Sequence, residues 1–289
     1  MKLLSLLKVL ALALVFTTPV SVAQAPPAVD LMTMTRDARC KQVLVTCLVN
    51  GVPMRMMLDT GATHTVLHEE SAARIPAAQW IDTSQMQFKG NSTQKPRLIL
   101  AALQAGPAEA PVHPFMVMNL SAVRSMMTEK IDGILGMDIL QAVPFTFDLR
   151  NEECYWGIPA GGGELVPLSA QANNMRRIFV TGKCGGKDVR MLLDTGSSVT
   201  RVVASEWAPG ASGEIQAQEG NIDQAGGVRV TEGHPGDIEL APGVVAKGVK
   251  PLLCDTPEGA ILGMDALQGQ VLVHIPAENT PVGLFLLQK

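Results

Sequence analysis

The chain is short of charged residues and has no cysteine motif, and each of these absences argues against a class of protein. Charged residues make up only 17% of the 289 residues and the formal net charge is −4, so we expect no nucleic-acid partner. The five cysteines form no CxxC pair and lie at no spacing that would gather metal ligands with a histidine, so we expect no metal and no cofactor. Because their number is odd, at least one cysteine stays free or pairs between chains.

Long apolar runs are also missing, apart from the start of the chain. Residues 1–25 begin with Lys2, continue through an apolar run from Val9 to Phe16 and end in small residues, which is typical of a secretory signal peptide. We expect cleavage after Ala23, giving a signal peptide of residues 1–23, because a cut after Ala25 would place Pro26 beside the scissile bond. The alternative is an uncleaved anchor, but the run is short for a membrane span. The mature protein is therefore expected to be periplasmic or secreted, with no stable membrane insertion.

An Asp-Thr-Gly tripeptide lies between two short apolar stretches. The stretch Met54–Leu58 is suited to a buried strand, Gly61 allows a sharp turn, and Thr65–Leu67 can resume as a second strand. This pattern places the Asp59 carboxylate on a loop between strands. A single copy would be explained equally well by a turn without chemistry.

The same pattern occurs a second time in the chain. With a shift of 135 residues, seven positions between Arg55 and Thr65 match those between Arg190 and Thr200, including a second Asp-Thr-Gly. A second motif follows each copy, Ile134–Gln141 and Ile261–Gln268, where the shift has fallen to 127. The chain is therefore an internal duplication, and the second copy lacks about eight residues between its two motifs.

The order of motifs in each half resembles that of the retropepsin-like aspartic proteases. It consists of an apolar strand, Asp-Thr-Gly-(Ala/Ser), a polar hairpin region and then Ile-Leu-Gly before a short helix. The resemblance covers nearly the whole mature chain, once in each half. It implies that Asp59 and Asp194 meet at a pseudo-twofold axis and form a catalytic dyad. It further implies that the two loops are braced by the residues that follow each acid, namely Thr60, Gly61, Thr195, Gly196 and Ser197.

The resemblance also implies a flap in each half, a mobile hairpin that closes over bound peptide. The corresponding polar tips contain Gly90 and Asn91 in the first half and Gly220 and Asn221 in the second. An ordinary surface hairpin is the alternative. Neither tip carries the tyrosine of pepsins, since the single tyrosine of the chain is Tyr155.

The expected fold class is mostly β, with two retropepsin-like β-barrel lobes related by a pseudo-twofold axis. Each lobe is expected to carry one or two short helices. The first lobe would span residues 28–159, the glycine linker 160–163 and the second lobe 164–289. Asp138 and Asp265 begin the short helices after the Ile-Leu-Gly motifs, where a cap or a favourable first-turn charge is the expected role.

One difference between the halves lies beside the acids: Gly61 is followed by Ala62, whereas Gly196 is followed by Ser197. In pepsin-like relatives a hydroxyl at this position donates to its own aspartate, which favours the ionised form. The resemblance therefore implies that Asp194 ionises more readily and that Asp59 more often holds the shared proton.

The sequence thus predicts a single-chain, monomeric aspartic endopeptidase, a hydrolase that acts on peptide or protein substrates. Two alternatives stay open. One is a duplicated module that binds peptides without cleaving them, although a pure binder has no need of two acids that repel each other. The other is an enzyme whose lobes pair between two chains.

Overall fold

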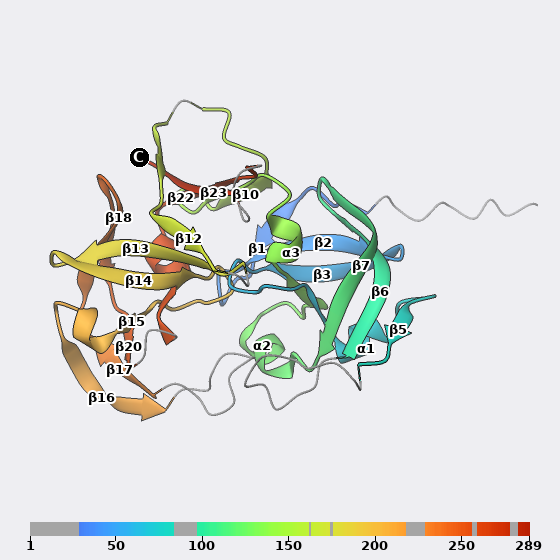
Figure 1. Cartoon of the computed structure of the whole chain (residues 1–289), viewed down its shortest axis with the longest axis horizontal. Coiled ribbons are helices and arrows are strands. Elements are labelled where there is room, and N and C mark those ends of the chain that lie inside the picture. Colours follow the sequence, from blue (N-terminus) through green and yellow to red (C-terminus); the bar gives the residue numbers. More distant parts are fainter. Residues whose placement is uncertain are drawn as a thin grey trace, which may run out of the picture.

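The computed structural model describes residues 29–83, 97–161, 163–173, 176–217, 229–255, 259–277 and 283–289. These residues form a mostly β molecule with two lobes and a smaller sheet between them (Figure 1). The expected signal peptide, residues 1–23, and the residues expected in the flaps, Gly90, Asn91, Gly220 and Asn221, lie outside the described residues.

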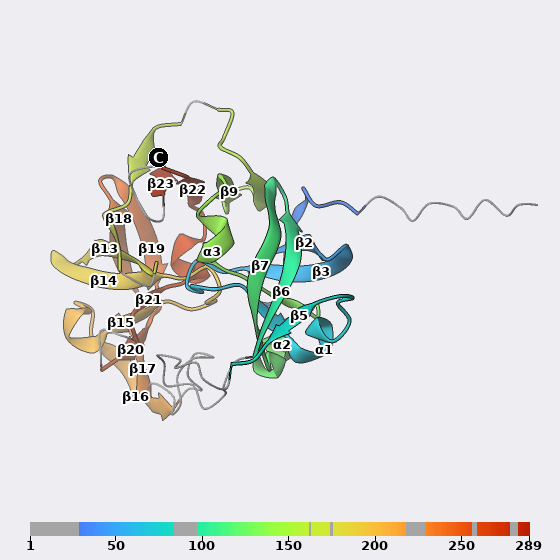
Figure 2. The same cartoon turned by 45° about the vertical axis from the view of Figure 1, so that its right-hand side comes forward.

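The first lobe is an eight-stranded sheet in the order β1-β2-β3-β8-β4-β7-β6-β5. Strand β2 also pairs with β6, so six of these strands close into a barrel, with the long β6–β7 hairpin running across it (Figure 2). The strands are β1 (Met34–Arg36), β2 (Val43–Val49), β3 (Val52–Leu58), β4 (Val66–His68), β5 (Gln79–Ile81), β6 (Arg97–Ala105), β7 (Ala108–Met118) and β8 (Gly133–Leu135).

The two faces of β3 belong to different parts of the core. Met54, Met56 and Leu58 point into the main core, which extends through both lobes. Because side chains alternate along a strand, Met57 lies on the other face, and Asp59 follows it there. On that face a second cluster packs against Ala62 of the Asp-Thr-Gly loop, and we call it the loop-side cluster: Leu44, Met57, Val66, Met118, Leu120, Met127, Ile131 and Ile134.

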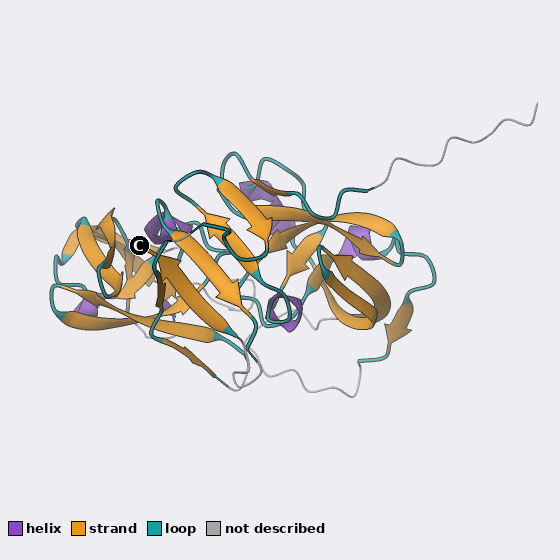
Figure 3. Cartoon of the chain, turned by 90° about the horizontal axis from the view of Figure 1, so that it is seen from above, coloured by secondary structure: helices purple, strands orange, loops and turns teal. Residues whose placement is uncertain are grey.

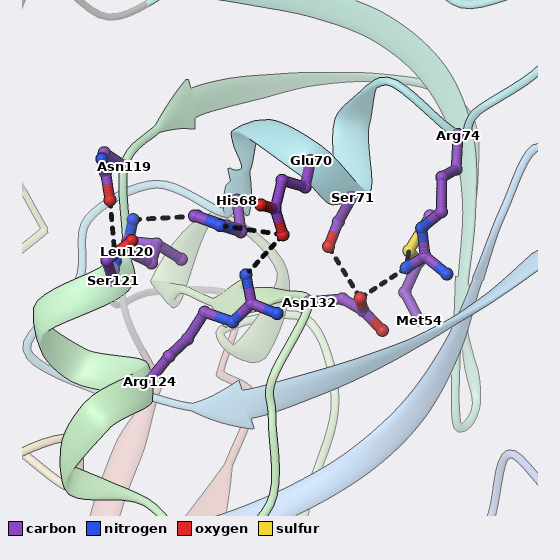
Figure 4. Close-up of polar contacts among 10 residues, drawn as sticks. All are labelled: Met54, His68, Glu70, Ser71, Arg74, Asn119, Leu120, Ser121, Arg124 and Asp132. Carbon is purple, nitrogen blue, oxygen red and sulfur yellow. Dashed lines mark hydrogen bonds and ion pairs between the residues drawn. The ribbon is translucent and has the colours of Figure 1, made fainter.

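Helices α1 (Glu69–Ala72) and α2 (Ser121–Met126) are tied to the strand that follows the Asp59 loop (Figure 4). His68 at the end of β4 accepts a hydrogen bond from the Leu120 amide at 3.0 Å, which holds the start of α2. Arg124 of α2 donates to Glu70 of α1 at 3.3 Å. Helix α2 thereby stays over the loop-side cluster, where the partly buried Val123 packs against it.

The second lobe is a ten-stranded sheet in which β16-β17-β20-β15-β21-β14-β13-β18-β19 are neighbours and β12 pairs with β13. Among its described strands no pairing closes the sheet as β2–β6 does in the first lobe. The strands are β12 (Ala170–Ala172), β13 (Ile178–Cys184), β14 (Lys187–Leu193), β15 (Arg201–Val203), β16 (Ala211–Ala217), β17 (Arg229–Gly233), β18 (Gly236–Ala241), β19 (Val244–Val249), β20 (Leu252–Cys254) and β21 (Ile261–Leu262).

Helices are short in both lobes. The described part of the first lobe carries α1, α2 and α3 (Met137–Leu140), one more than expected, and that of the second carries α4 (Met264–Leu267) and the 3-10 turn η1 (Ala204–Glu206). Fourteen residues separate β7 from β8 and include α2, whereas six separate β20 from β21. The eight residues missing from the second repeat are therefore the ones that place α2 over the loop-side cluster.

A third sheet joins the two halves, in the order β10-β9-β22-β23-β11. Its strands are β9 (Phe145–Asp148), β10 (Glu153–Trp156), β11 (Leu165–Pro167), β22 (Val271–Ile275) and β23 (Leu284–Gln288). Strands β9 and β22 pair antiparallel with Thr146 opposite Val273, two positions that the 127-residue shift relates to each other. The pseudo-twofold axis therefore passes through this pair, and the two lobes lie on either side (Figure 3).

All five cysteines lie within the described residues, and none of them forms a disulfide there. Burial raises the pKa of Cys47 and of Cys154 to about 12, so both thiols stay protonated and unreactive. No helix in the described part of the chain is long and apolar enough to cross a membrane.

Candidate active site

Each Asp-Thr-Gly loop begins where an inner strand ends beside the Ile-Leu-Gly strand. The Asp59 amide donates to the Leu135 carbonyl at 3.0 Å, and the Asp194 amide donates to the Leu262 carbonyl at 3.1 Å. The glycine after each of these strands touches the loop so closely that a Cβ on Gly136 would lie 2.7 Å from the His64 carbonyl carbon. No side chain fits at this position, so glycine lets the strand and the loop come this close.

The two loops are locked together by a symmetric set of hydrogen bonds. The amide of Thr60 donates to the hydroxyl of Thr195 at 3.1 Å, and the amide of Thr195 donates to the hydroxyl of Thr60 at 3.1 Å. Each hydroxyl in turn donates to a backbone carbonyl of the opposite strand, Thr60 to Leu193 at 2.8 Å and Thr195 to Leu58 at 3.0 Å. Both threonines are buried, so every one of these groups would lose its partner if the loops separated.

The bracing brings the two acids face to face across the axis. A Cβ added to Gly61 would lie 2.5 Å from the carboxyl carbon of Asp194, and one added to Gly196 would overlap the carboxylate of Asp59. Each glycine therefore packs against the acid of the other half. The structure thus brings together Asp59 and Asp194, which are 135 residues apart in the sequence.

One carboxylate oxygen of each acid, Oδ1, accepts hydrogen bonds from backbone amides of its own loop. Oδ1 of Asp59 accepts from the amides of Gly61 at 2.7 Å and Ala62 at 3.1 Å. Oδ1 of Asp194 accepts from the amides of Gly196 at 2.9 Å and Ser197 at 3.0 Å. Both acids are only half-buried, so water and a ligand can still reach them.

The electrostatics of the pair favour retention of a proton. Burial raises the pKa of the Asp59 carboxyl above its ordinary value, although the loop amides oppose this. Burial, and after it the charge of Asp59, raise the pKa of Asp194 well above its ordinary value. Two like charges this close do not ionise together readily, so over a range of pH the pair carries one proton and one charge.

The expected role of the Ser197 hydroxyl is wrong. Ser197 Oγ donates to the carbonyl of Val199 at 2.9 Å, and only the Ser197 amide reaches Asp194. The hydroxyl points away from Asp194 because the Val199 carbonyl, two residues along the same loop, accepts its hydrogen bond. The unequal ionisation expected from Ala62 and Ser197 therefore loses its structural basis.

Asp138 and Asp265 both lie in the first turn of a helix, as expected of a favourable first-turn charge, but neither is the N-cap residue. The N-cap residues are Gly136 and Gly263, which have no side chain to form a cap. Instead, Asp138 accepts from the amide and hydroxyl of Thr65 at 2.8 and 2.7 Å, and Asp265 accepts from those of Thr200 at 2.8 and 2.5 Å. Each aspartate thus fixes the strand that leaves the acid's loop.

The first lobe adds a histidine to this brace. Nε2 of His113 lies 3.2 Å from Oδ2 of Asp138, and both side chains are buried. Burial raises the pKa of Asp138, but hydrogen bonds from His113 and Thr65 outweigh it and hold the pKa below its ordinary value. The matching of Thr65 with Thr200 and of the two helix aspartates was visible in the repeat, and it could have identified this brace.

One further contact crosses between the lobes and was missed. The buried Gln42, just before β2, donates from Nε2 to the Gly196 carbonyl at 3.1 Å and to the Ser198 hydroxyl at 2.9 Å. No signal in the sequence pointed to it, because Gln42 is matched by Arg177 in the other repeat.

The described residues contain no group of three or more His, Cys, Asp or Glu side chains placed to hold a metal ion. The chemistry available here comes from two facing carboxyl groups, a shared proton and the water that reaches them. Such a pair can accept a proton from water and donate one to a carbonyl oxygen.

Residues 45–139 match the model of a family described as aspartyl protease. This segment contains Asp59, its loop and the first Ile-Leu-Gly strand, so this part of the chain is similar to aspartyl proteases. No curated protein matches the sequence.

Among solved structures, the crystal structure of basic 7S globulin from soybean is similar to this chain. The TM-score is 0.52 at 11% sequence identity, over 89% of this chain and 95% of that chain. At this identity the likeness shows the fold alone. It confirms the expected mostly β, two-lobed fold, which is similar to that of pepsin-like aspartic proteases.

A first prediction concerns stability. Because the folded pKa values of the two acids are raised, the stability linked to them is present below the unfolded pKa and is lost as pH rises through the folded values. Asp194→Asn should therefore raise Tm near neutral pH, and the gain should shrink toward about pH 3, below the unfolded aspartate pKa, where the carboxyls are protonated in both states. Thermal unfolding followed by circular dichroism across this range measures it.

The matched control is Asp188→Asn, at an exposed acid that forms an ion pair with Lys183. It should change Tm little at either pH. A variant Asp194→Asn that is less stable than wild type near neutral pH would show that the two acids do not repel each other.

Proposed function

We propose that the protein is an aspartic endopeptidase in which Asp59 and Asp194 form the catalytic dyad. One observation carries the proposal: each Asp-Thr-Gly glycine packs against the carboxylate of the other half, which leaves the two acids facing each other with raised pKa values. The aspartyl protease family match over the first half supports it.

In the proposed reaction, one ionised carboxylate takes a proton from a water molecule held between the acids. The water attacks the peptide carbonyl, and the protonated carboxyl gives its proton to the carbonyl oxygen. The buried threonine pair keeps the two acids in register, so neither has to move during the step. Gly61 and Gly196 leave room for substrate and for the opposite acid.

The substrates we propose are peptides or proteins outside the cytoplasm, in the periplasm or the medium, after removal of residues 1–23. The proposed unit is a single chain, because β9 of the first half pairs with β22 of the second in a shared sheet and both acids lie in one polypeptide.

The test is a peptide-library digest with the purified mature chain, analysed by mass spectrometry, beside the variant Asp59→Asn/Asp194→Asn. Cleavage by the wild type alone supports the proposal. A wild type that binds library peptides but leaves them intact across about pH 3–8 would favour the binding module instead.

A second prediction follows from the single-chain unit. The initial rate should rise linearly with enzyme concentration, and light scattering should give the mass of one chain. A rate that grows with the square of the concentration at high dilution would show that the lobes pair between chains.

A further inference from the structure

The second lobe carries a buried positive charge at a position where the first lobe has an apolar residue. The 135-residue shift relates Arg201 to Val66, directly after the matched pair Thr65 and Thr200. Arg201 is only 6% exposed, which is rare for an arginine and costs stability unless the charge interacts with other groups.

Strand register places Arg201 on the same face as Asp194. Arg201 lies opposite Ile261, and Ile261 lies opposite Leu192, two residues before Asp194. Directly opposed residues point to the same face of a sheet, and so do residues two apart on one strand.

In the first lobe, the three residues that match Leu192, Ile261 and Arg201 are all apolar. They are Met57, Ile134 and Val66, which all belong to the loop-side cluster beside Asp59, beneath α2. In the second lobe α2 has no counterpart among the described residues, and Leu192 and Ile261 join no cluster there. The first lobe therefore has the apolar Val66 beside Asp59, whereas the second lobe has the guanidinium of Arg201 on the face of Asp194.

We propose that Arg201 is a positioning residue for the dyad, whose guanidinium favours the ionised form of the acid pair and so extends the working range of the site toward acid. This rests on the proposed function. Burial leaves the field of Arg201 poorly screened by solvent, and this field lowers the pKa of Asp194, opposing the larger effects of burial and of Asp59.

Other ionisable groups lie on the elements near Arg201 and Asp194. They are Asp59 on the opposite loop, Arg177 before β13, Arg190 on β14, Glu232 on β17, Cys254 on β20, Asp255 after it, and Asp265 on α4. Asp265 is engaged by Thr200, and Glu232 lies two strands beyond Arg201 but on the same face, because both residues lie opposite Leu252. Arg190 shares the strand and face of Asp194 but is exposed, with its guanidinium 3.9 Å from the centre of the Phe179 ring.

The test is Arg201→Met, which keeps most of the apolar stem and removes the charge, followed through the pH dependence of kcat/KM. Without the guanidinium the dyad ionises at higher pH, so both limbs of the profile should move toward neutral by about half a unit or more. Arg201→Lys keeps the charge and should retain the wild-type profile. Arg190→Met removes an exposed charge from the same strand and should also leave the profile in place.

A profile that moves no further in Arg201→Met than in Arg190→Met would overturn the proposal. So would an equal movement in Arg201→Lys, since packing rather than charge would then be responsible. If the wild type cleaves no peptide, the proposed function fails separately. The carboxyl titration of ¹³C-aspartate-labelled protein then still decides the role of Arg201, through the same comparison of apparent pKa values.

Discussion

Asp59→Asn and Asp194→Asn should each reduce kcat/KM by at least about a thousandfold while the fold is retained, because neither acid can both accept and donate the proton without the other. An amide keeps the hydrogen bonds from the loop amides to Oδ1, so the loops should stay in place. Peptide cleavage assays and near-ultraviolet circular dichroism measure the two parts of this prediction.

The double variant is the informative control. Residues that act as one unit show losses that do not add, so the double variant should be little worse than either single variant. Losses that multiply would indicate two separate sites. A residual rate within about tenfold of wild type in either single variant would rule out the shared dyad.

Gly61→Ala should reduce kcat/KM by at least about a hundredfold even though both acids are intact. The added Cβ would lie 2.5 Å from the carboxyl carbon of Asp194, so the loop or the acid has to shift. Displacement of a catalytic group by about an ångström is enough for a loss of this size. Gly196→Ala should behave alike, because its Cβ would overlap Asp59.

Gly161→Ala is the matched control, since no atom lies within 4 Å of a Cβ placed there. It should keep activity within about twofold of wild type. If Gly61→Ala were as active as this control, the two acids would not face each other as closely as the structure places them.

Much of the arrangement around the acids followed from the repeat. Matching Thr60 with Thr195 predicted two equivalent loops, and the crossed hydrogen bonds between them have the symmetry that this match implies. The 127-residue shift also relates Thr146 to Val273, which pair in the shared sheet. Such features can be predicted because a duplicated sequence repeats both its local structure and its position relative to the axis.

The details that escaped prediction depend on competition between nearby partners. Whether the Ser197 hydroxyl donates to Asp194 or to the Val199 carbonyl is decided by a side-chain rotation, which residue types do not specify. Asp138 was read as a cap or a favourable first-turn charge because its partner Thr65 is 73 residues away in the sequence. Val66 and Arg201 could have been compared directly, but only strand register shows that this difference faces the acid.

The most direct test of the central claim, that one chain supplies both acids of one site, is to mix the purified variants Asp59→Asn and Asp194→Asn and assay the mixture. A single-chain dyad predicts no recovery, because each molecule still lacks one acid. If lobes pair between chains, the mixture would contain assemblies that combine one intact Asp59 with one intact Asp194, and cleavage would return to about a quarter or more of the wild-type rate. Such recovery would contradict the account.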